Sequence, residues 1–208
     1  LMPVPAVLAG ALSRSVKKGK IGVLGRALPL VNNPLTIAEE YAMLDTITEG
    51  RLIAGFVRGI GAEYHSMGIN PAHSKDRFSE AHDLIIRAWT EPGPFEFVGK
   101  HYHFKYVNPW PLPYQKPHPP IWVGANRTKL QATNIGKAGL GFWEGPSMRI
   151  AVFRRNAGVY KEAARAAGHP EHAIKCGLFR DVCIAETQDE ALRIMDEDLL
   201  PMYEEQYV

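Results

Sequence analysis

Five short apolar segments recur along this chain, and a segment with helical periodicity follows each of them. We expect strands at 21–30, 51–57, 121–124, 140–143 and 175–185. They are apolar throughout and do not alternate with polar residues, which is typical of parallel strands buried on both faces. Parallel strands joined by helices form either an open doubly wound sheet or a (β/α)8 barrel. The pattern therefore predicts an α/β fold of one of these two kinds.

The connecting segments carry apolar residues at the three- and four-residue spacing of amphipathic helices. A helix expected at 4–16 precedes the first strand. Asn33 followed by Pro34 predicts the start of the next helix, because these residues suit an N-cap and a first helical position, and Gly50 closes it. The other helices are expected at 77–89, at 129–137, at 147–167 and from Thr187 onward.

One stretch departs from this alternation. Alternating aromatic residues from Phe95 to Tyr106 predict a small hairpin that turns at Gly99 and Lys100. The proline-rich run 109–120 suits neither a helix interior nor a central strand, so we expect a stiff surface connector. We therefore expect residues 1–208 to form a single domain with an insertion at about 95–120.

Composition argues against several classes of partner. The chain has a formal net charge of +2 with 22% charged residues, so no basic surplus points to nucleic acid. No apolar run approaches the roughly 20 residues that a membrane helix requires. His101 and His103 could share a strand face, but no third ligand lies at a recognisable spacing, so we predict no metal site. We expect a cytoplasmic protein that binds neither nucleic acid nor membranes.

The strand at 51–57 ends at Arg58, which Gly59 and Gly61 follow closely. The planar guanidinium of an arginine suits a phosphate, and neighbouring glycines allow backbone N–H groups to approach an anion. The alternative is an arginine paired with a structural carboxylate such as Glu63. We expect a polar loop at 59–75, with no helix directly after the glycines.

Two other strand-to-helix turns also favour anions. Lys75 and Arg77 lie where a predicted helix begins, and residues 124–128 follow the strand at 121–124. Because the carboxyl ends of parallel strands meet at one edge of a sheet, we expect these turns to share a rim with Arg58. Together they predict a phosphate site at this rim.

Seven stretches of the sequence carry a resemblance to a known family: 44–45, 50–52, 55–59, 77–80, 89–94, 99–102 and 117–124. Together they resemble the bacterial luciferase-like flavin-dependent monooxygenases, in the branch of the luciferase alpha subunit and limonene-type monooxygenases. They cover most of the chain and are specific in combination. The resemblance implies a (β/α)8 barrel, present here as an incomplete fragment that lacks the first strands and the closing unit.

The resemblance also implies a function. Members of this family bind FMN, which a separate reductase delivers in reduced form, and use it with O2 on a hydrophobic small molecule such as an aldehyde or a terpene. Two alternatives remain open: an oxidoreductase that uses the deazaflavin F420, and a truncated barrel that binds flavin without catalysis. Family analogy implies a homodimer for the full-length protein.

The resemblance assigns site residues by position. It places the FMN phosphate at Arg58 and the backbone amide of Ile60, with Lys75 or Arg77 as a second cation. A non-prolyl cis peptide at Leu24-Gly25 is expected to back the flavin ring. The resemblance also places Ala125, Asn126 and Arg127 at the phosphate and ribityl chain. From its place at a strand end on the predicted rim, we expect Trp143 to lie beside a planar ligand. We further expect Glu63 and His65 to be catalytic side chains on the substrate side.

Overall fold

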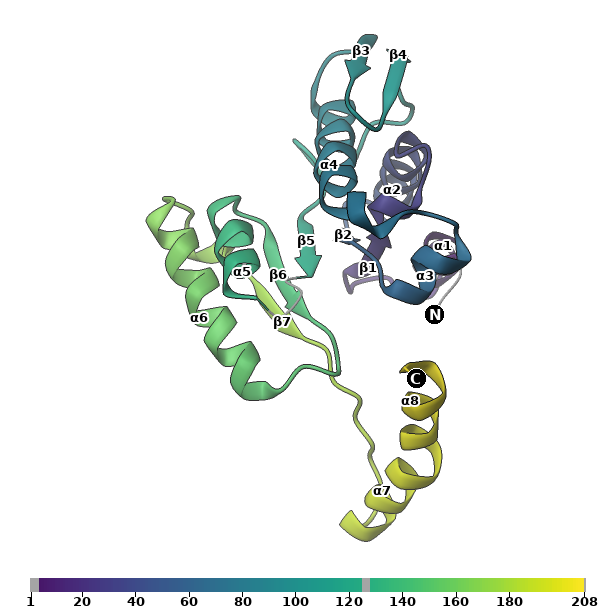
Figure 1. Ribbon diagram of the computed structural model, residues 1–208, viewed down its shortest axis with the longest axis vertical. Coiled ribbons are helices and arrows are strands. Elements are labelled where there is room, and N and C mark those ends of the chain that lie inside the picture. The colour runs from purple at the N-terminus through teal and green to yellow at the C-terminus, as the bar shows by residue number, and fades with distance from the viewer. Residues whose placement is uncertain (1–3, 125–127, 208) are drawn as a thin grey trace.

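The computed structural model describes residues 4–124 and 128–207, and a five-stranded parallel sheet forms its centre (Figure 1). The strands follow one another across the sheet in chain order, and each pairs in parallel with its neighbours. A doubly wound sheet reverses its strand order at a switch point, and this sheet does not. The fold is therefore an arc of a (β/α)8 barrel. The strands are β1 (Ile21–Ala27), β2 (Leu52–Val57), β5 (Ile121–Gly124), β6 (Gly141–Glu144) and β7 (Cys176–Leu178).

Helices cover one face of this sheet and bury its larger apolar side chains. Phe56, Val123 and Phe142 lie in register on three adjacent strands, and all three are buried. Trp122 and Trp143 alternate with them and remain partly exposed on the opposite face, which corresponds to the inside of a barrel. The covering helices are α1 (Pro5–Ser13), α2 (Leu35–Ile47), α4 (Ser74–Thr90), α5 (Lys129–Lys137) and α6 (Ile150–Ala166).

The insertion contains the expected hairpin, made of the antiparallel strands β3 (Phe95–Val98) and β4 (His103–Val107). The carboxylate of Glu80 on α4 holds its turn, because it accepts hydrogen bonds from the backbone N–H groups of Lys100, His101 and Tyr102 at 3.0, 2.9 and 2.6 Å. A side chain at Gly99 would collide with this carboxylate. Two of the stretches that carry the family resemblance, 77–80 and 99–102, therefore form one structural unit.

The proline-rich connector is fastened to the body by a buried carboxylate. Asp45 of α2 is fully buried and accepts hydrogen bonds from the backbone N–H and the side-chain amide of Gln115, both at 2.7 Å. The prolines of this connector cannot donate backbone hydrogen bonds. Gln115 therefore supplies hydrogen-bond donors that are scarce in the rest of the run. Gln115 thus fastens the connector to α2 shortly before β5 begins at Ile121.

Several expectations about element bounds were wrong. The helices expected at 4–16, 77–89 and 147–167 are Pro5–Ser13, Ser74–Thr90 and Ile150–Ala166. The first strand ends at Ala27, and a short 3-10 helix, η1 (Leu28–Leu30), replaces its predicted end. The last strand stops at Leu178, because among the described residues no further strand lies beside it to pair with its continuation. A short helix, α3 (Gly61–Ser66), begins directly after the Arg58 turn, where we expected a loop. The 3-10 helices η2 (Pro71–His73) and η3 (Glu171–Ala173) complete the loops.

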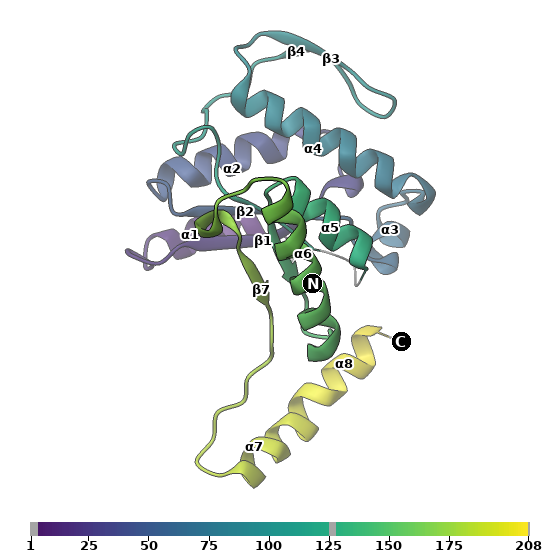
Figure 2. The same cartoon turned by 90° about the vertical axis from the view of Figure 1, so that its left-hand side faces the viewer.

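The C-terminal segment leaves the sheet and projects away from it (Figures 1 and 2). It contains α7 (Gln188–Ile194), the π-helix η4 (Met195–Leu199) and α8 (Leu200–Tyr207). Thr187 caps this segment as predicted, since its hydroxyl accepts a hydrogen bond from Glu190 N at 3.2 Å. None of the helices in the described ranges combines the length and the apolar composition needed to cross a bilayer.

The packing of α5 against α6 predicts opposite effects for two glycine substitutions. A Cβ atom at Gly136 of α5 would lie 2.4 Å from the carbonyl oxygen of Tyr160 on α6, whereas a Cβ atom at Gly158 of α6 would meet nothing within 4 Å. We expect Gly136→Ala to lower the free energy of unfolding by about 1–3 kcal/mol. Gly158→Ala should raise it by about 0.5–1 kcal/mol, because alanine favours the helix. Urea denaturation measures both, and equal effects would contradict the packing.

Candidate functional site

The carboxyl end of β2 carries a turn that exposes backbone and one cation. Arg58 follows the strand directly, and Gly59 has a φ of 86°, which favours glycine. The buried Tyr64 of α3 donates its hydroxyl proton to the carbonyl oxygen of Arg58. Burial raises the pKa of Tyr64, although a hydrogen bond with Ser74 and the charge of Arg58 oppose this. The tyrosine therefore stays protonated at neutral pH and fastens α3 to the turn.

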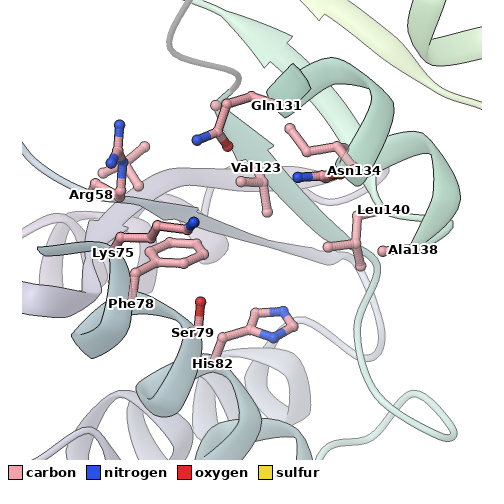
Figure 3. A pocket seen from close by; sticks show the side chains of 13 residues that line it. Arg58, Lys75, Phe78, Ser79, His82, Val123, Gln131, Asn134, Ala138 and Leu140 are labelled. Atoms are coloured by element: carbon pink, nitrogen blue, oxygen red, sulfur yellow. The ribbon is translucent and has the colours of Figure 1, made fainter. Parts of the chain in front are cut away.

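A cavity of about 320 Å³ opens beside this turn, between α4 and α5 (Figure 3). Arg58 lies at one end of it, and the ammonium group of Lys75 points into it from the first turn of α4. None of the described residues that line it is acidic. A cavity with two cations and no carboxylate among these residues suits an anion. The lining consists of Val57, Arg58, Lys75, Phe78, Ser79, His82, Val123, Gly124, Gln131, Asn134, Ile135, Ala138 and Leu140.

Arg77 has a structural role instead of lining this cavity. Its guanidinium donates to the carbonyl oxygens of Pro29 and Val31, at 2.8 and 2.9 Å, and lies 4.9 Å from the centre of the Tyr102 ring. These contacts join α4 to η1 and to the hairpin. Of the two candidates for a second cation, the geometry thus favours Lys75. The predicted residues Ala125, Asn126 and Arg127 lie outside the described residues.

The amide that the resemblance assigns to the phosphate is paired within the protein. The N–H of Ile60 donates to the Glu63 carboxylate at 2.9 Å, an N-terminal capping contact for α3. Glu63 also lines a separate groove along α1 and β1, together with Leu24 and Gly25. His65 is exposed and lines a different, shallow hollow beside α3. The structure therefore does not bring Glu63 and His65 to the cavity of Arg58, and a catalytic role for them stays a prediction.

The peptide bond between Leu24 and Gly25 is cis, as the resemblance implies. It lies at a shift in the pairing of β1 with β2, between Val23 and Arg26. A Cβ atom at Gly25 would lie 2.7 Å from the carbonyl oxygen of Gly55, so the two strands approach too closely for a side chain there. Position 25 is consequently a glycine for a steric reason.

Trp143 stands near the carboxyl end of β6, on the partly exposed face of the sheet. Its ring would lie 3.5 Å from a Cβ atom built at Gly124, and it meets the Phe179 ring edge-on at 5.4 Å between centres. Its Nε1 is buried and has no hydrogen-bond partner within 4–124 and 128–207. The indole therefore presents a flat face and an unused donor near the strand ends, which suits a planar polar ligand.

Sequence reasoning missed most of the polar side chains of the cavity. Ser79 and His82 of α4 and Gln131 and Asn134 of α5 line it, yet we predicted no role for any of them. A signal was available, since polar residues at 75, 79 and 82 interrupt a helix face at helical spacing. Which neighbour that face meets is decided by the sheet order, which the pattern alone does not reveal.

The chain is similar in sequence to known monooxygenases. The model of the family described as luciferase-like monooxygenase matches residues 3–208. The chain is 32% identical over 128 residues to the oxygenase component of a flavin-dependent trigonelline monooxygenase from Acinetobacter baylyi, covering 60% of this chain and 35% of that protein. It is 28% identical over 182 residues to an FMNH2-dependent dimethylsulfone monooxygenase from Pseudomonas putida, covering 86% of this chain and 48% of that protein.

A solved structure agrees with these sequence matches. The monooxygenase RslO1 from Streptomyces bottropensis superposes with a TM-score of 0.81 at 26% identity, covering 98% of this chain and 65% of that one. Of the two curated relatives described above, the chain spans about a third and about a half of the length.

The contrast between Arg77 and Lys75 is testable by stability. Arg77→Met removes two charged hydrogen bonds to backbone carbonyls, so we expect the free energy of unfolding to fall by about 2 kcal/mol. Lys75→Met, on the same helix, removes an exposed cation and should change it by less than about 0.5 kcal/mol. Chemical denaturation of both variants measures the difference. A similar loss in the two variants would contradict the structural role of Arg77.

Proposed function

Because the chain belongs to the luciferase-like monooxygenase family, we propose that it acts as a flavin-dependent monooxygenase, using reduced FMN and O2 on a hydrophobic small molecule such as an aldehyde or a terpene. The names of two relatives, a flavin-dependent and an FMNH2-dependent monooxygenase, support this proposal. The observation that carries it is the cation-lined cavity at the carboxyl ends of β2 and β5. This rim is where barrel enzymes bind phosphate groups and build their active sites.

The residues present fit the phosphate end of FMN. Arg58 and Lys75 supply two cations, and none of the described residues that line the cavity is acidic. Gly124 ends β5 in the same cavity, where a residue without a side chain lets a ligand approach the backbone. We propose that Arg58 and Lys75 hold the phosphate by charge-assisted hydrogen bonds.

The partly exposed face of the sheet is the proposed place of the flavin ring. Trp143 offers its flat indole and its unused N–H there. The cis peptide at Leu24-Gly25 lies within β1, where Gly25 meets Gly55 of β2, and we propose that it backs the ring as the resemblance implies. Trp122 spreads over the next strand, since a Cβ atom at Gly141 would lie 2.5 Å from its ring. These indoles provide an apolar surface that keeps water from the reacting atoms. Bound reduced FMN supplies the electrons with which one oxygen atom of O2 enters the substrate and the other leaves as water.

Two partners follow from this proposal. One relative is named as an oxygenase component, and on that analogy we propose that a separate reductase delivers reduced FMN to this protein. We also propose that the full-length protein is a homodimer. Both remain proposals about the whole protein, because this chain spans only about a third to a half of the length of the two relatives.

Removing Arg58 tests the phosphate site directly. We expect Arg58→Ala to raise the dissociation constant of FMN about tenfold or more, because a charge-assisted contact is lost. Arg14→Ala, at an exposed arginine of the α1 end, is the matched control and should leave it unchanged. Flavin fluorescence titration measures both. Unaltered FMN affinity in Arg58→Ala would remove Arg58 from the site.

Turnover distinguishes the alternatives. The protein should consume O2 when supplied with chemically reduced FMN and an aldehyde or terpene, and should not do so with reduced F420. Hydride transfer with F420 and no oxygen uptake would favour an F420-dependent oxidoreductase. Tight FMN binding with no oxygen-dependent product would favour a flavin-binding barrel without catalysis.

A further inference from the structure

The cavity between α4 and α5 extends well beyond its two cations. Each helix contributes lining residues at relative positions 0, 3, 4 and 7, which share one helix face. Helix faces that only packed against each other would be apolar, whereas five of these eight side chains are polar. The cavity is therefore a polar-lined space between two helices. The facing residues are Lys75, Phe78, Ser79 and His82 on α4, and Gln131, Asn134 and Ile135 on α5 with Ala138 at its C-cap.

His82 is held rigidly at the cavity and has an unused polar atom. Its ring lies parallel to Phe78 at 6.2 Å and edge-on to Phe56 at 5.8 Å between centres. Its Nε2 is buried and forms no hydrogen bond within the described part of the chain. Burial lowers the pKa of His82, and nearby His118 lowers it further, against the opposing charge of Asp83. The ring is neutral at pH 7, and a buried imidazole nitrogen without a partner points to a ligand or a water there.

The other end of the cavity is cationic. Among the described residues Lys75 forms no ion pair. Its ammonium group points into the cavity, with Arg58 at the same end (Figure 3). Lys75 and His82 are seven residues apart on α4, which corresponds to about 10 Å along the helix. Phe78, Val123 and Ile135 form an apolar wall along part of the space between them, beside the polar side chains of Ser79, Gln131 and Asn134. The volume of about 320 Å³ equals that of about ten water molecules.

We propose that this cavity binds a small, flat carboxylate that carries a second hydrogen-bonding group at its far end. Lys75 and Arg58 pair with the carboxylate, the apolar wall holds the ring of the ligand, and His82 Nε2 meets the far polar group. A benzoate with a para hydroxyl group has this layout, because with a hydrogen bond of roughly 3 Å at each end it covers a span of this order. The ligand site shares its cations with the proposed flavin phosphate site and does not depend on flavin chemistry.

Three probes separate the contributions in protein without flavin: 4-hydroxybenzoate, benzoate and phenol. Isothermal titration calorimetry measures their affinities. We expect 4-hydroxybenzoate to bind about fivefold to tenfold more tightly than benzoate, because only its hydroxyl reaches His82. Phenol, which lacks the carboxylate, should bind most weakly. Since flavin is absent, these results stand whether or not the protein is a monooxygenase.

Two variants test the assigned contacts. His82→Leu should lower the affinity for 4-hydroxybenzoate to that for benzoate and leave benzoate binding unchanged. Lys75→Met should weaken both acids about tenfold and leave phenol unchanged. Lys137→Met removes an exposed cation of α5 that does not line the cavity, and it should alter none of the three affinities.

Several outcomes would overturn the proposal. Equal affinity of the unaltered protein for 4-hydroxybenzoate and benzoate would exclude the contact with His82, and absence of binding by either acid would exclude the site. A His82→Leu variant that melts normally but loses both acids alike would show a general packing role. If His82→Leu does not fold, the affinities of the unaltered protein and of Lys75→Met for the three ligands still test the proposal.

Discussion

The buried ring of Phe56 connects the parts of this structure that matter for its site. Phe56 lies in β2, fully buried, and its ring packs against Tyr41 of α2 and against His82 and Trp89 of α4 at 5.7, 5.8 and 6.4 Å between centres. It therefore fixes two helices against the second strand. Because Arg58 follows only two residues later, the cation at the strand end and the histidine of the cavity are positioned by the same aromatic contact. Packing at native density transmits such constraints over short distances.

Helix α4 divides its surface between support and binding. On one side, Arg77 and Glu80 hold η1 and the hairpin turn through backbone carbonyl and N–H groups. On the side toward α5, Lys75 and His82 line the cavity. The two sets are separated by helical periodicity alone, since residues two or five positions apart point in different directions. This explains why charged residues so close in sequence have such different surroundings.

The turn after β2 shows how local contacts can compete with ligand binding. Glu63 caps α3 through the N–H of Ile60, and Tyr64 binds the carbonyl oxygen of Arg58. These contacts order the turn. They also occupy the N–H of Ile60, which would otherwise be available to donate a hydrogen bond to a phosphate. In the proposed site, recognition of the phosphate consequently depends on the side chains of Arg58 and Lys75 more than on that amide.

The sequence by itself determined the strand and helix types, the hairpin and the place of Arg58, because apolar periodicity, proline positions and turn residues are local properties. It also carried the family resemblance that placed the cis peptide at Leu24-Gly25. Periodicity alone left open the doubly wound sheet against the barrel, because strand order depends on pairing between segments far apart in the chain. The family resemblance implied the barrel, and the strand order of the structure agrees with it. Only the tertiary structure assigned Arg77 to support and Lys75 to the cavity, and brought His82 opposite α5. Those roles depend on which helices lie side by side, and that follows from the order β1-β2-β5-β6-β7.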